Sequence, residues 1–139
     1  CWTSGAGSRQ GEASGLLVGG NLAVIAGLVS TPYDLFSPGT ILFIEDIAEP
    51  IYKVERILWQ LRLSGVLPAL AGLVVGQFTE YRPDRNYRDM EAMIYDMTAD
   101  YGYPVSFGAP VGHVDHNVPL LHGAVATLSV GDGMSRLAF

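Results

Sequence analysis

The segment 39–56, GTILFIEDIAEPIYKVER, decides the fold, because it joins an apolar run to two adjacent carboxylates and then to a helix pattern. Its first part, Thr40–Glu45, has the continuous apolar character of a strand buried on both faces. In open α/β sheets, ligands gather at the carboxyl ends of such strands. We therefore expect one of the two acids at this point, Glu45 or Asp46, to be functional.

Alternating strand and helix patterns surround this segment. Pro50 is tolerated in the first turn of a helix, so a helix is predicted from there to Gly65. Its apolar face consists of Ile51, Val54, Leu58 and Leu61, which recur at helical spacing, and of Ile57 and Trp59, which widen it. The same rules predict helices at 21–28 and 87–101, and strands at 15–18, 71–78, 105–108, 124–130 and 134–139. The last two strands flank a Gly-Asp-Gly turn and should form a hairpin. This order predicts an α/β domain with a mixed, curled sheet and flanking helices.

The chain has the size and composition of one domain. It has 139 residues, of which 49% are hydrophobic, and its mean hydropathy is +0.27, which suffices for a genuine core. Residues 1–14 are rich in Gly and Ser and predict a linker or an irregular leading segment. The folded domain is therefore expected at 15–139, with Asn21 as the N-cap of its first helix.

The charge balance narrows the expected partners. Eight basic against fourteen acidic residues give a net charge of −6, and no basic run offers a surface for nucleic acid or an anionic membrane. No apolar run approaches the roughly 18 residues that cross a bilayer. The single cysteine, Cys1, suits a reducing compartment such as the cytoplasm. A small molecule or a peptide is the expected ligand.

The three histidines, His113, His116 and His122, lie within ten residues of one another in a loop rich in Gly and Pro. A carboxylate at a neighbouring strand end, such as Glu45, can orient an imidazole through one ring nitrogen and stabilise its charged form. Such a pair is the orienting half of a nucleophilic triad.

Two alternatives stay open for these residues. Glu45 is equally suited to stabilise the start of the following helix, although Asp46 and Glu49 are better candidates for that cap. The run His113–His116 overlaps the end of a zinc-binding motif. A catalytic zinc normally has three protein ligands, however, and the chain has no distant histidine to complete such a site.

A nucleophile for the triad cannot be identified. No serine lies in a G-x-S-x-G motif, and Ser4, Ser8 and Ser14 fall in the segment expected to be irregular, where nothing would hold a hydroxyl group in place. Cys1 is no better placed. If Glu45 and the histidine loop form part of a triad, its third member is absent from this chain.

Four motifs together resemble the C-terminal domain of the LD-carboxypeptidases, a serine peptidase family that includes murein tetrapeptide carboxypeptidases and microcin C immunity proteins. In chain order they are LLVGGNL (16–22), GTILFIEDIAEPIYKVERILWQLRLSGVL (39–67), LVVGQF (73–78) and PVSFGAPVGHVDHNVPLLHG (104–123). The resemblance runs from about Gly15 to the end of the chain. It implies a C-terminal domain of the swivelling β/β/α type, preceded in the whole protein by a domain that carries the nucleophilic serine and the oxyanion hole.

The resemblance also implies residue roles. The Glu of the family's L-E-D motif falls on Glu45, and the His of its G-H motif falls on His113. His113 would then act as general base and general acid, and Glu45 would orient it. Asn21 and Gly112 are expected to contact the substrate. Ala48 stands where the family commonly has Gly, and the segment 119–123 is one residue longer than expected. These two departures concern the identity of the substrate more than the chemistry.

The implied reaction is hydrolysis of an L,D amide bond, which releases the terminal D-alanine of a murein tetrapeptide in the cytoplasm without a metal or organic cofactor. The expected partners are the peptide, the protein's own N-terminal domain and a second copy in a homodimer. The isolated chain is expected to be inactive. The alternatives are a peptide-binding domain without catalysis and a zinc-dependent hydrolase.

Overall fold

The central sheet of the computed structural model, which describes residues 1–139, has seven strands in the order β1-β7-β6-β2-β3-β4-β5. The strands are β1 (Trp2–Thr3), β2 (Gly11–Asn21), β3 (Ile41–Ile47), β4 (Gly72–Thr79), β5 (Val105–Ser106), β6 (Val125–Val130) and β7 (Met134–Ala138). The helices are α1 (Leu22–Ala26), α2 (Ile51–Leu63) and α3 (Met90–Thr98), with a single 3-10 turn, η1 (Leu67–Ala69). No helix has the length and apolar character needed to cross a membrane. The predicted fold class, a mixed α/β sheet with flanking helices, is confirmed.

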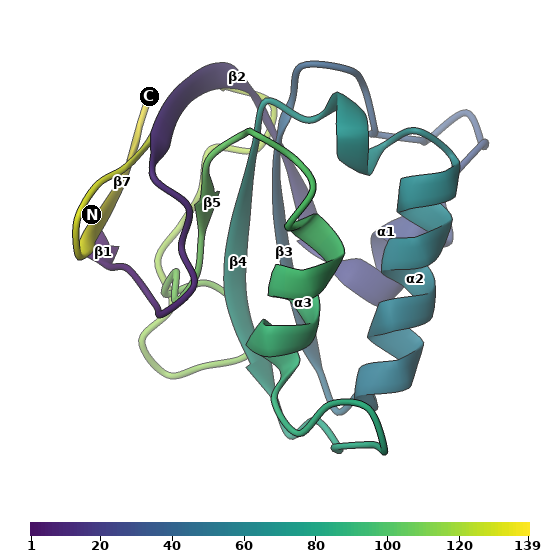
Figure 1. The fold of residues 1–139 in the computed structure, drawn as a ribbon. Coiled ribbons are helices and arrows are strands. Elements are labelled where there is room, and N and C mark those ends of the chain that lie inside the picture. The colour runs from purple at the N-terminus through teal and green to yellow at the C-terminus, as the bar shows by residue number, and fades with distance from the viewer.

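Strand β2 joins the two halves of the sheet. Its residues from Gly11 to Leu16 pair antiparallel with β6, and those from Leu17 to Asn21 pair parallel with β3. Strands β4 and β5 extend the parallel half, whereas β7 and β1 extend the antiparallel half. Figure 1 shows β2 arching from the β7 side of the molecule to the β3 side, which gives the sheet its curl.

Residues 1–14 are more regular than the sequence predicts. Both β1 and the first residues of β2 pair within the sheet, so the expectation of an irregular linker is wrong for them. Small polar residues suit a strand whose outer side faces solvent, and the Oγ atom of Ser14 lies 2.7 Å from Oγ1 of Thr127 on β6. Trp2 anchors the start of the chain, because its Nε1 donates a hydrogen bond to Ser106 Oγ (3.1 Å).

Strand β2 continues through Gly19 and Gly20, where the sequence predicts its end. A side chain at Gly19 would overlap the carbonyl oxygen of Phe43 on β3, so glycine here permits a close approach of two strands. The strand reaches Asn21, which pairs with Glu45. This extension places the start of α1 beside the end of β3.

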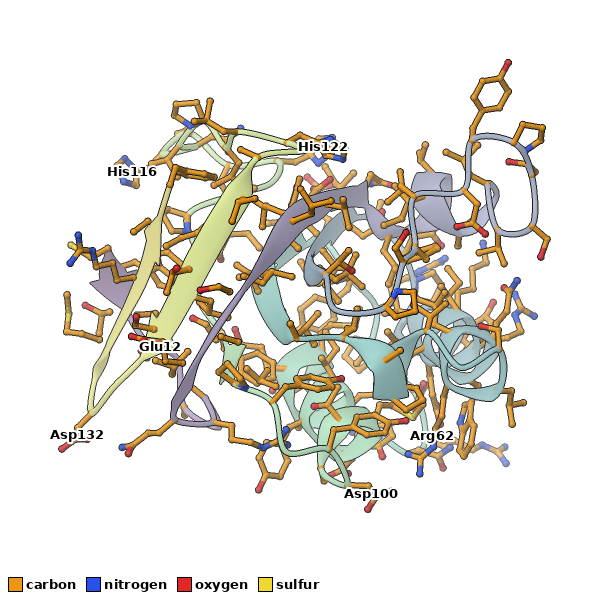
Figure 2. All side chains as sticks on the ribbon, turned by 90° about the horizontal axis from the view of Figure 1, so that it is seen from above. Glu12, Arg62, Asp100, His116, His122 and Asp132 are labelled. Atoms are coloured by element: carbon orange, nitrogen blue, oxygen red, sulfur yellow. The ribbon has the colours of Figure 1, made fainter.

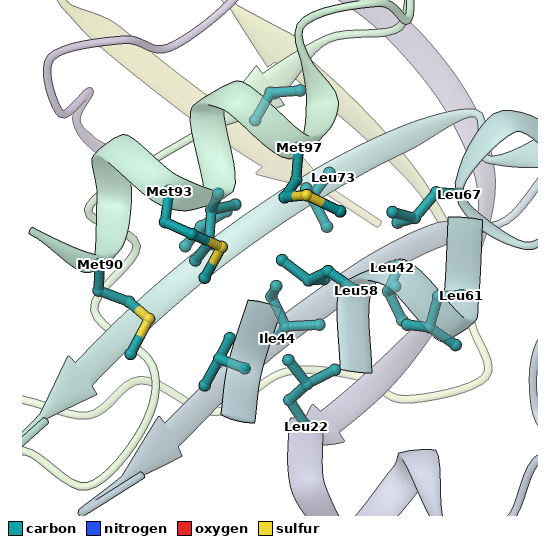
Figure 3. Packing of buried hydrophobic residues seen from close by; sticks show 14 of the residues in the cluster. Leu22, Leu42, Ile44, Leu58, Leu61, Leu67, Leu73, Met90, Met93 and Met97 are labelled. Carbon is teal, nitrogen blue, oxygen red and sulfur yellow. The ribbon is translucent and has the colours of Figure 1, made fainter. Parts of the chain in front are cut away.

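Hydrophobic side chains fill both sides of the parallel strands. On one side, the three helices cover them with a cluster of 19 buried residues, part of which Figure 3 shows. On the other side, a second cluster joins β2, β3, β4 and β6 to the loop after β5. Leu42 and Ile44 face the helices and Ile41 faces the second cluster, so β3 is buried on both faces, as predicted. The acids that follow, Glu45 and Asp46, accordingly face opposite sides of the sheet.

The helices follow the predicted apolar spacing, but α1 is shorter than the predicted range 21–28 and α3 is shorter than predicted as well. The fully buried residues of α2 are Ile51, Val54, Leu58 and Leu61, as the spacing predicts, whereas Trp59, which was expected to widen the apolar face, is 44% exposed. Helix α3 is shorter than the predicted range 87–101, because the side chain of Asp89 accepts from the backbone N–H of Ala92 and begins the helix there. Residues 107–124 form no helix or strand and carry all three histidines.

Candidate active site

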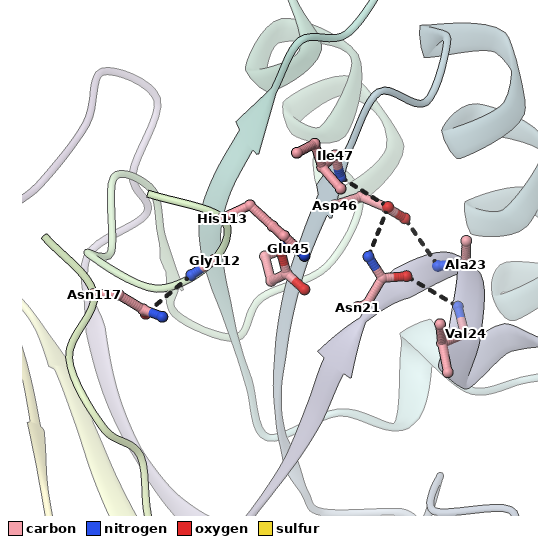
Figure 4. Close-up of polar contacts among 9 residues, drawn as sticks. All are labelled: Asn21, Ala23, Val24, Glu45, Asp46, Ile47, Gly112, His113 and Asn117. Carbon is pink, nitrogen blue, oxygen red and sulfur yellow. Dashed lines mark hydrogen bonds and ion pairs between the residues drawn. The ribbon is translucent and has the colours of Figure 1, made fainter. Parts of the chain in front are cut away.

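Glu45 and His113 form a direct pair at the carboxyl end of β3. The Nδ1 atom of His113 lies 2.8 Å from Oε2 of Glu45, across 68 residues of sequence. The Glu45 side chain is 8% exposed, whereas the His113 side chain is 49% exposed. Figure 4 shows the two side chains together, with Asn117 on one side of them and Asn21 on the other. The structure therefore brings together the two residues that the sequence singles out.

A bulge in β4 makes room for this pair. The register between β3 and β4 shifts at Glu45, so that Gly76 and Gln77 together lie opposite it. A side chain at Gly76 would overlap the carbonyl oxygen of Val111. The missing side chain thus lets the loop that carries His113 lie directly against β4.

The end of β4 holds this loop through three hydrogen bonds. The backbone N–H of Ala109 donates to the carbonyl of Val75 (3.1 Å), and the backbone N–H of Gln77 donates to the carbonyl of Val111 (2.7 Å). The Gln77 side chain adds a bond from Nε2 to the carbonyl of Ala109 (3.0 Å). The segment 109–111 is therefore an extension of the sheet edge up to the residue before the histidine motif.

Gly112 lies against the carboxylate of Glu45. Its φ angle is +134°, and a Cβ atom there would lie 3.2 Å from Oε2 of Glu45 and 3.0 Å from the carbonyl oxygen of Gln77. Its N–H donates to Oδ1 of Asn117 (3.3 Å). Glycine is required at this position by both the backbone angle and the close contact. The role of Gly112 in substrate binding remains a prediction.

Asp46 lies on the opposite face of the sheet, where it stabilises the start of α1. Its carboxylate accepts from the backbone N–H of Ala23 (2.9 Å) and from Nδ2 of Asn21 (2.8 Å). The expectation that Asp46 caps the following helix is wrong, because the parallel pairing of β2 with β3 places it beside the preceding one. Helix α2 begins after Pro50 without a side-chain cap.

Asn21 caps α1 as predicted, since its Oδ1 accepts from the backbone N–H of Val24 (3.1 Å). With Nδ2 bonded to Asp46, both ends of its side-chain amide have partners within the chain. Its substrate-binding role remains a prediction. Glu49, the other candidate cap, forms an ion pair with Lys53 (3.5 Å).

The pair borders an open pocket of about 340 Å³. Its lining residues are Gly20, Phe43, Glu45, Val111, Gly112, His113 and Asn117. No lysine or arginine lines this pocket. Four of these residues were not predicted as site residues: Gly20, Phe43, Val111 and Asn117. The one sequence feature that could have indicated Asn117 is its amide side chain, four residues after His113 in an irregular loop.

The other two histidines do not join the pair. The His122 ring lies edge-on to the Phe43 ring, with centroids 6.2 Å apart. Figure 2 shows His116 and His122 apart from each other at one end of the β6–β7 hairpin. No three His, Cys, Asp or Glu side chains are placed to hold a metal ion. The structure thus contradicts the zinc-site alternative for His113–His116.

The geometry of the pair suits general base chemistry. A carboxylate on Nδ1 fixes the imidazole tautomer whose Nε2 accepts a proton. The Nε2 atom of His113 makes no hydrogen bond within the chain, and no Ser, Thr or Cys side chain bonds to this ring. The pair therefore has the geometry of a base and its orienting carboxylate, and no hydroxyl or thiol group of the chain bonds to it.

These features define an α/β domain that presents an imidazole, held on a buried carboxylate, at the carboxyl edge of a parallel sheet. Residues 14–128 match the family model of the LD-carboxypeptidase C-terminal domain. The chain belongs to the LD-carboxypeptidase family.

Named relatives support this membership. The chain is 33% identical over 124 residues to a probable murein peptide carboxypeptidase of Bacillus subtilis, covering 88% of this chain and 39% of that protein. It is 32% identical over 123 residues to the murein tetrapeptide carboxypeptidase of Pseudomonas aeruginosa, covering 88% of this chain and 40% of that protein. The crystal structure of muramoyltetrapeptide carboxypeptidase from Oxalobacter formigenes matches 98% of this chain and 47% of that one, with a TM-score of 0.87 and 37% identity. The chain thus spans 39–40% of the length of these two curated relatives.

Proposed function

We propose that this chain supplies the general base and its orienting carboxylate to a serine-type LD-carboxypeptidase that releases the terminal D-alanine of a murein tetrapeptide. The observation that carries the proposal is the 2.8 Å contact between Nδ1 of His113 and Oε2 of Glu45. The substrate class is supported by the relatives, which are named murein peptide and murein tetrapeptide carboxypeptidases.

The proposed reaction has two steps. First, Nε2 of His113 removes the proton of a serine hydroxyl supplied by the preceding domain, while the serine oxygen bonds to the carbonyl carbon of the L,D amide. His113 then donates that proton to the amide nitrogen, so that the C–N bond breaks and D-alanine leaves. Second, Nε2 of His113 takes a proton from a water molecule while the water oxygen bonds to the acyl carbon. His113 then donates that proton to the serine oxygen as the ester C–O bond breaks, which releases the shortened peptide and restores the serine. No metal or organic cofactor takes part.

Glu45 stabilises the charged imidazole that forms in each step. Its side chain is only 8% exposed, and an ionic hydrogen bond is stronger in such a site than in water. The Glu45 carboxylate also fixes the direction of Nε2, which must reach the serine. We propose that the reaction takes place in the cytoplasm and that the whole protein is a homodimer. The partners of this chain are then the peptide substrate and the N-terminal domain.

The test of substrate and reaction uses the full-length protein that contains this chain. We expect it to release D-alanine from L-Ala-γ-D-Glu-meso-diaminopimelyl-D-Ala. A peptide of the same sequence that ends in L-alanine is the matched control, and we expect at most slow cleavage of it. Tight binding of the tetrapeptide without release of D-alanine would instead indicate a peptide-binding domain and overturn the proposal.

The 139-residue chain alone is expected to release no D-alanine, because no nucleophilic side chain bonds to His113. Removing one member of a triad lowers kcat by about 10⁴-fold or more. Turnover by this chain alone, at a rate near that of the full-length protein, would contradict the division of the triad between two domains.

A further inference from the structure

The loop 110–118, which carries His113, is fixed mainly by polar contacts. The two ends of the loop are joined by a hydrogen bond from the backbone N–H of Val118 to the carbonyl of Pro110 (2.9 Å). Within the loop, the N–H of Gly112 donates to Oδ1 of Asn117 (3.3 Å). The residues from Asp115 to Asn117 are exposed, so apolar packing contributes little there. Val111 packs against the second hydrophobic cluster, but beyond it hydrogen bonds contribute more than apolar packing to the position of 115–117.

The peptide unit between Val111 and Gly112 is held at both of its polar groups. Its carbonyl accepts from the backbone N–H of Gln77 (2.7 Å), and its N–H donates to Asn117. This peptide unit lies one residue before His113, so its orientation affects the position of the His113 backbone. Gly112 itself is the least restrained residue type, with a φ of +134°. The Asn117 bond thus restricts the glycine that links the segment 109–111, which β4 holds, to His113.

We propose that Asn117 is a positioning residue for His113, which keeps the imidazole on Glu45 by accepting the N–H of Gly112. This inference rests on the proposed role of His113 as general base. Asn117 acts through the loop and does not touch the bond that is cleaved. Without the Asn117 acceptor, the Gly112 N–H would bond to water instead. The backbone at Gly112 could then rotate and carry His113 with it. A base displaced by about 1 Å can lose as much as 100-fold in rate.

Asn117 also lines the pocket, and its Nδ2 makes no hydrogen bond within the chain. A donor to the substrate is therefore the competing role. Replacement by aspartate separates the two roles, because aspartate keeps an acceptor for Gly112 and removes both N–H donors. Replacement by alanine removes both functions. Asp115→Ala, in the same exposed loop, is the matched control, since Asp115 makes no side-chain hydrogen bond or ion pair.

The first measurement is NMR of the His113 imidazole in the 139-residue chain, which requires no activity. In the unmodified chain, we expect a slowly exchanging Nδ1–H resonance, because this N–H donates a hydrogen bond to the Glu45 carboxylate. The resonance should broaden or vanish in Asn117→Ala and remain in Asn117→Asp and Asp115→Ala. An unchanged resonance in Asn117→Ala would overturn the inference.

The second measurement is D-alanine release by the full-length protein. We expect Asn117→Ala to lower kcat by roughly 10- to 100-fold with KM changed less than about twofold, and Asn117→Asp to restore most of the lost kcat. Equal losses in both variants, with a raised KM, would assign Asn117 to substrate contact and overturn the inference. If the unmodified protein releases no D-alanine while the NMR result holds, the proposed function fails and the positioning of His113 stands.

Discussion

At Gly112 the backbone passes so close to Glu45 that a Cβ atom would lie 3.2 Å from the carboxylate oxygen that contacts His113. Gly112→Ala should therefore displace either the carboxylate or the loop, and lower kcat/KM for D-alanine release by roughly 100-fold. Gly123→Ala is the matched control, because Gly123 also has a positive φ of +81° but has no atom within 4 Å of its Cβ position. Steady-state kinetics of the full-length variants test this contrast, and equal losses in both would show that backbone strain alone is responsible.

The pairing of Glu45 with His113 was predictable because each residue lies in a recognisable motif, whereas the partners of Asp46 and Gly112 were not. Asp46 precedes α2 in sequence, yet it bonds to α1 through Ala23, because strand pairing places the two side by side. The Asn117 bond likewise depends on how the loop folds back on itself. Contacts that register and loop closure create leave little trace in a single sequence.

At the scale of the elements, the start of α1 depends on the amide of Asn21. Asn21→Ala should lower the free energy of unfolding by about 1 kcal/mol, because it removes a helix cap. Aspartate is also a good cap, but Asn21→Asp would place a second carboxylate beside Asp46, where Nδ2 now donates (2.8 Å). We therefore expect Asn21→Asp to destabilise the chain at neutral pH. Urea unfolding measures the stability of both variants. If Asn21→Asp were as stable as the original chain, the contact between Asn21 and Asp46 would not have the proposed effect.

The element order was largely predictable, because buried strands and amphipathic helices leave strong periodic patterns. The four buried residues of α2 and the β6–β7 hairpin agree with their predicted positions. Residues 1–14 were not predictable, since Gly- and Ser-rich sequence forms a strand only when a partner such as β6 supplies its hydrogen bonds. The end of β2 was predicted too early, because glycines usually end a strand. Here Gly19 instead lets β2 lie close to Phe43 of β3.

At the scale of the whole molecule, the N-terminal segment lies beside Glu91 of α3, since a Cβ atom on Gly5 would lie 3.5 Å from Oε2 of Glu91. Burial, and then the nearby charge of Asp89, raise the pKa of the Glu91 carboxyl above its ordinary value of 4.5. A raised pKa favours the folded state while the carboxyl is protonated, and this contribution is lost as pH rises from the ordinary value through the folded value. At pH 7, Glu91→Gln should therefore have a higher Tm than the original chain.

The gain from Glu91→Gln should shrink below about pH 4, where the carboxyl is protonated in both states. Thermal unfolding at pH 7 and pH 3.5 measures the difference. Glu55→Gln removes the same charge from a molecule of net charge −6 and is the control for overall repulsion. An equal gain in both variants, or a gain that persists at pH 3.5, would show that burial of Glu91 is not the cause.

The central claim is that His113, held by Glu45, is the base of a triad completed by another domain. The most direct measurement is the rate of D-alanine release from the murein tetrapeptide by the full-length protein carrying His113→Ala, beside His116→Ala as the matched histidine in the same loop. We predict that His113→Ala lowers kcat by about 10⁴-fold or more, while His116→Ala leaves it within about threefold. A His113→Ala protein with near-normal kcat would contradict the claim.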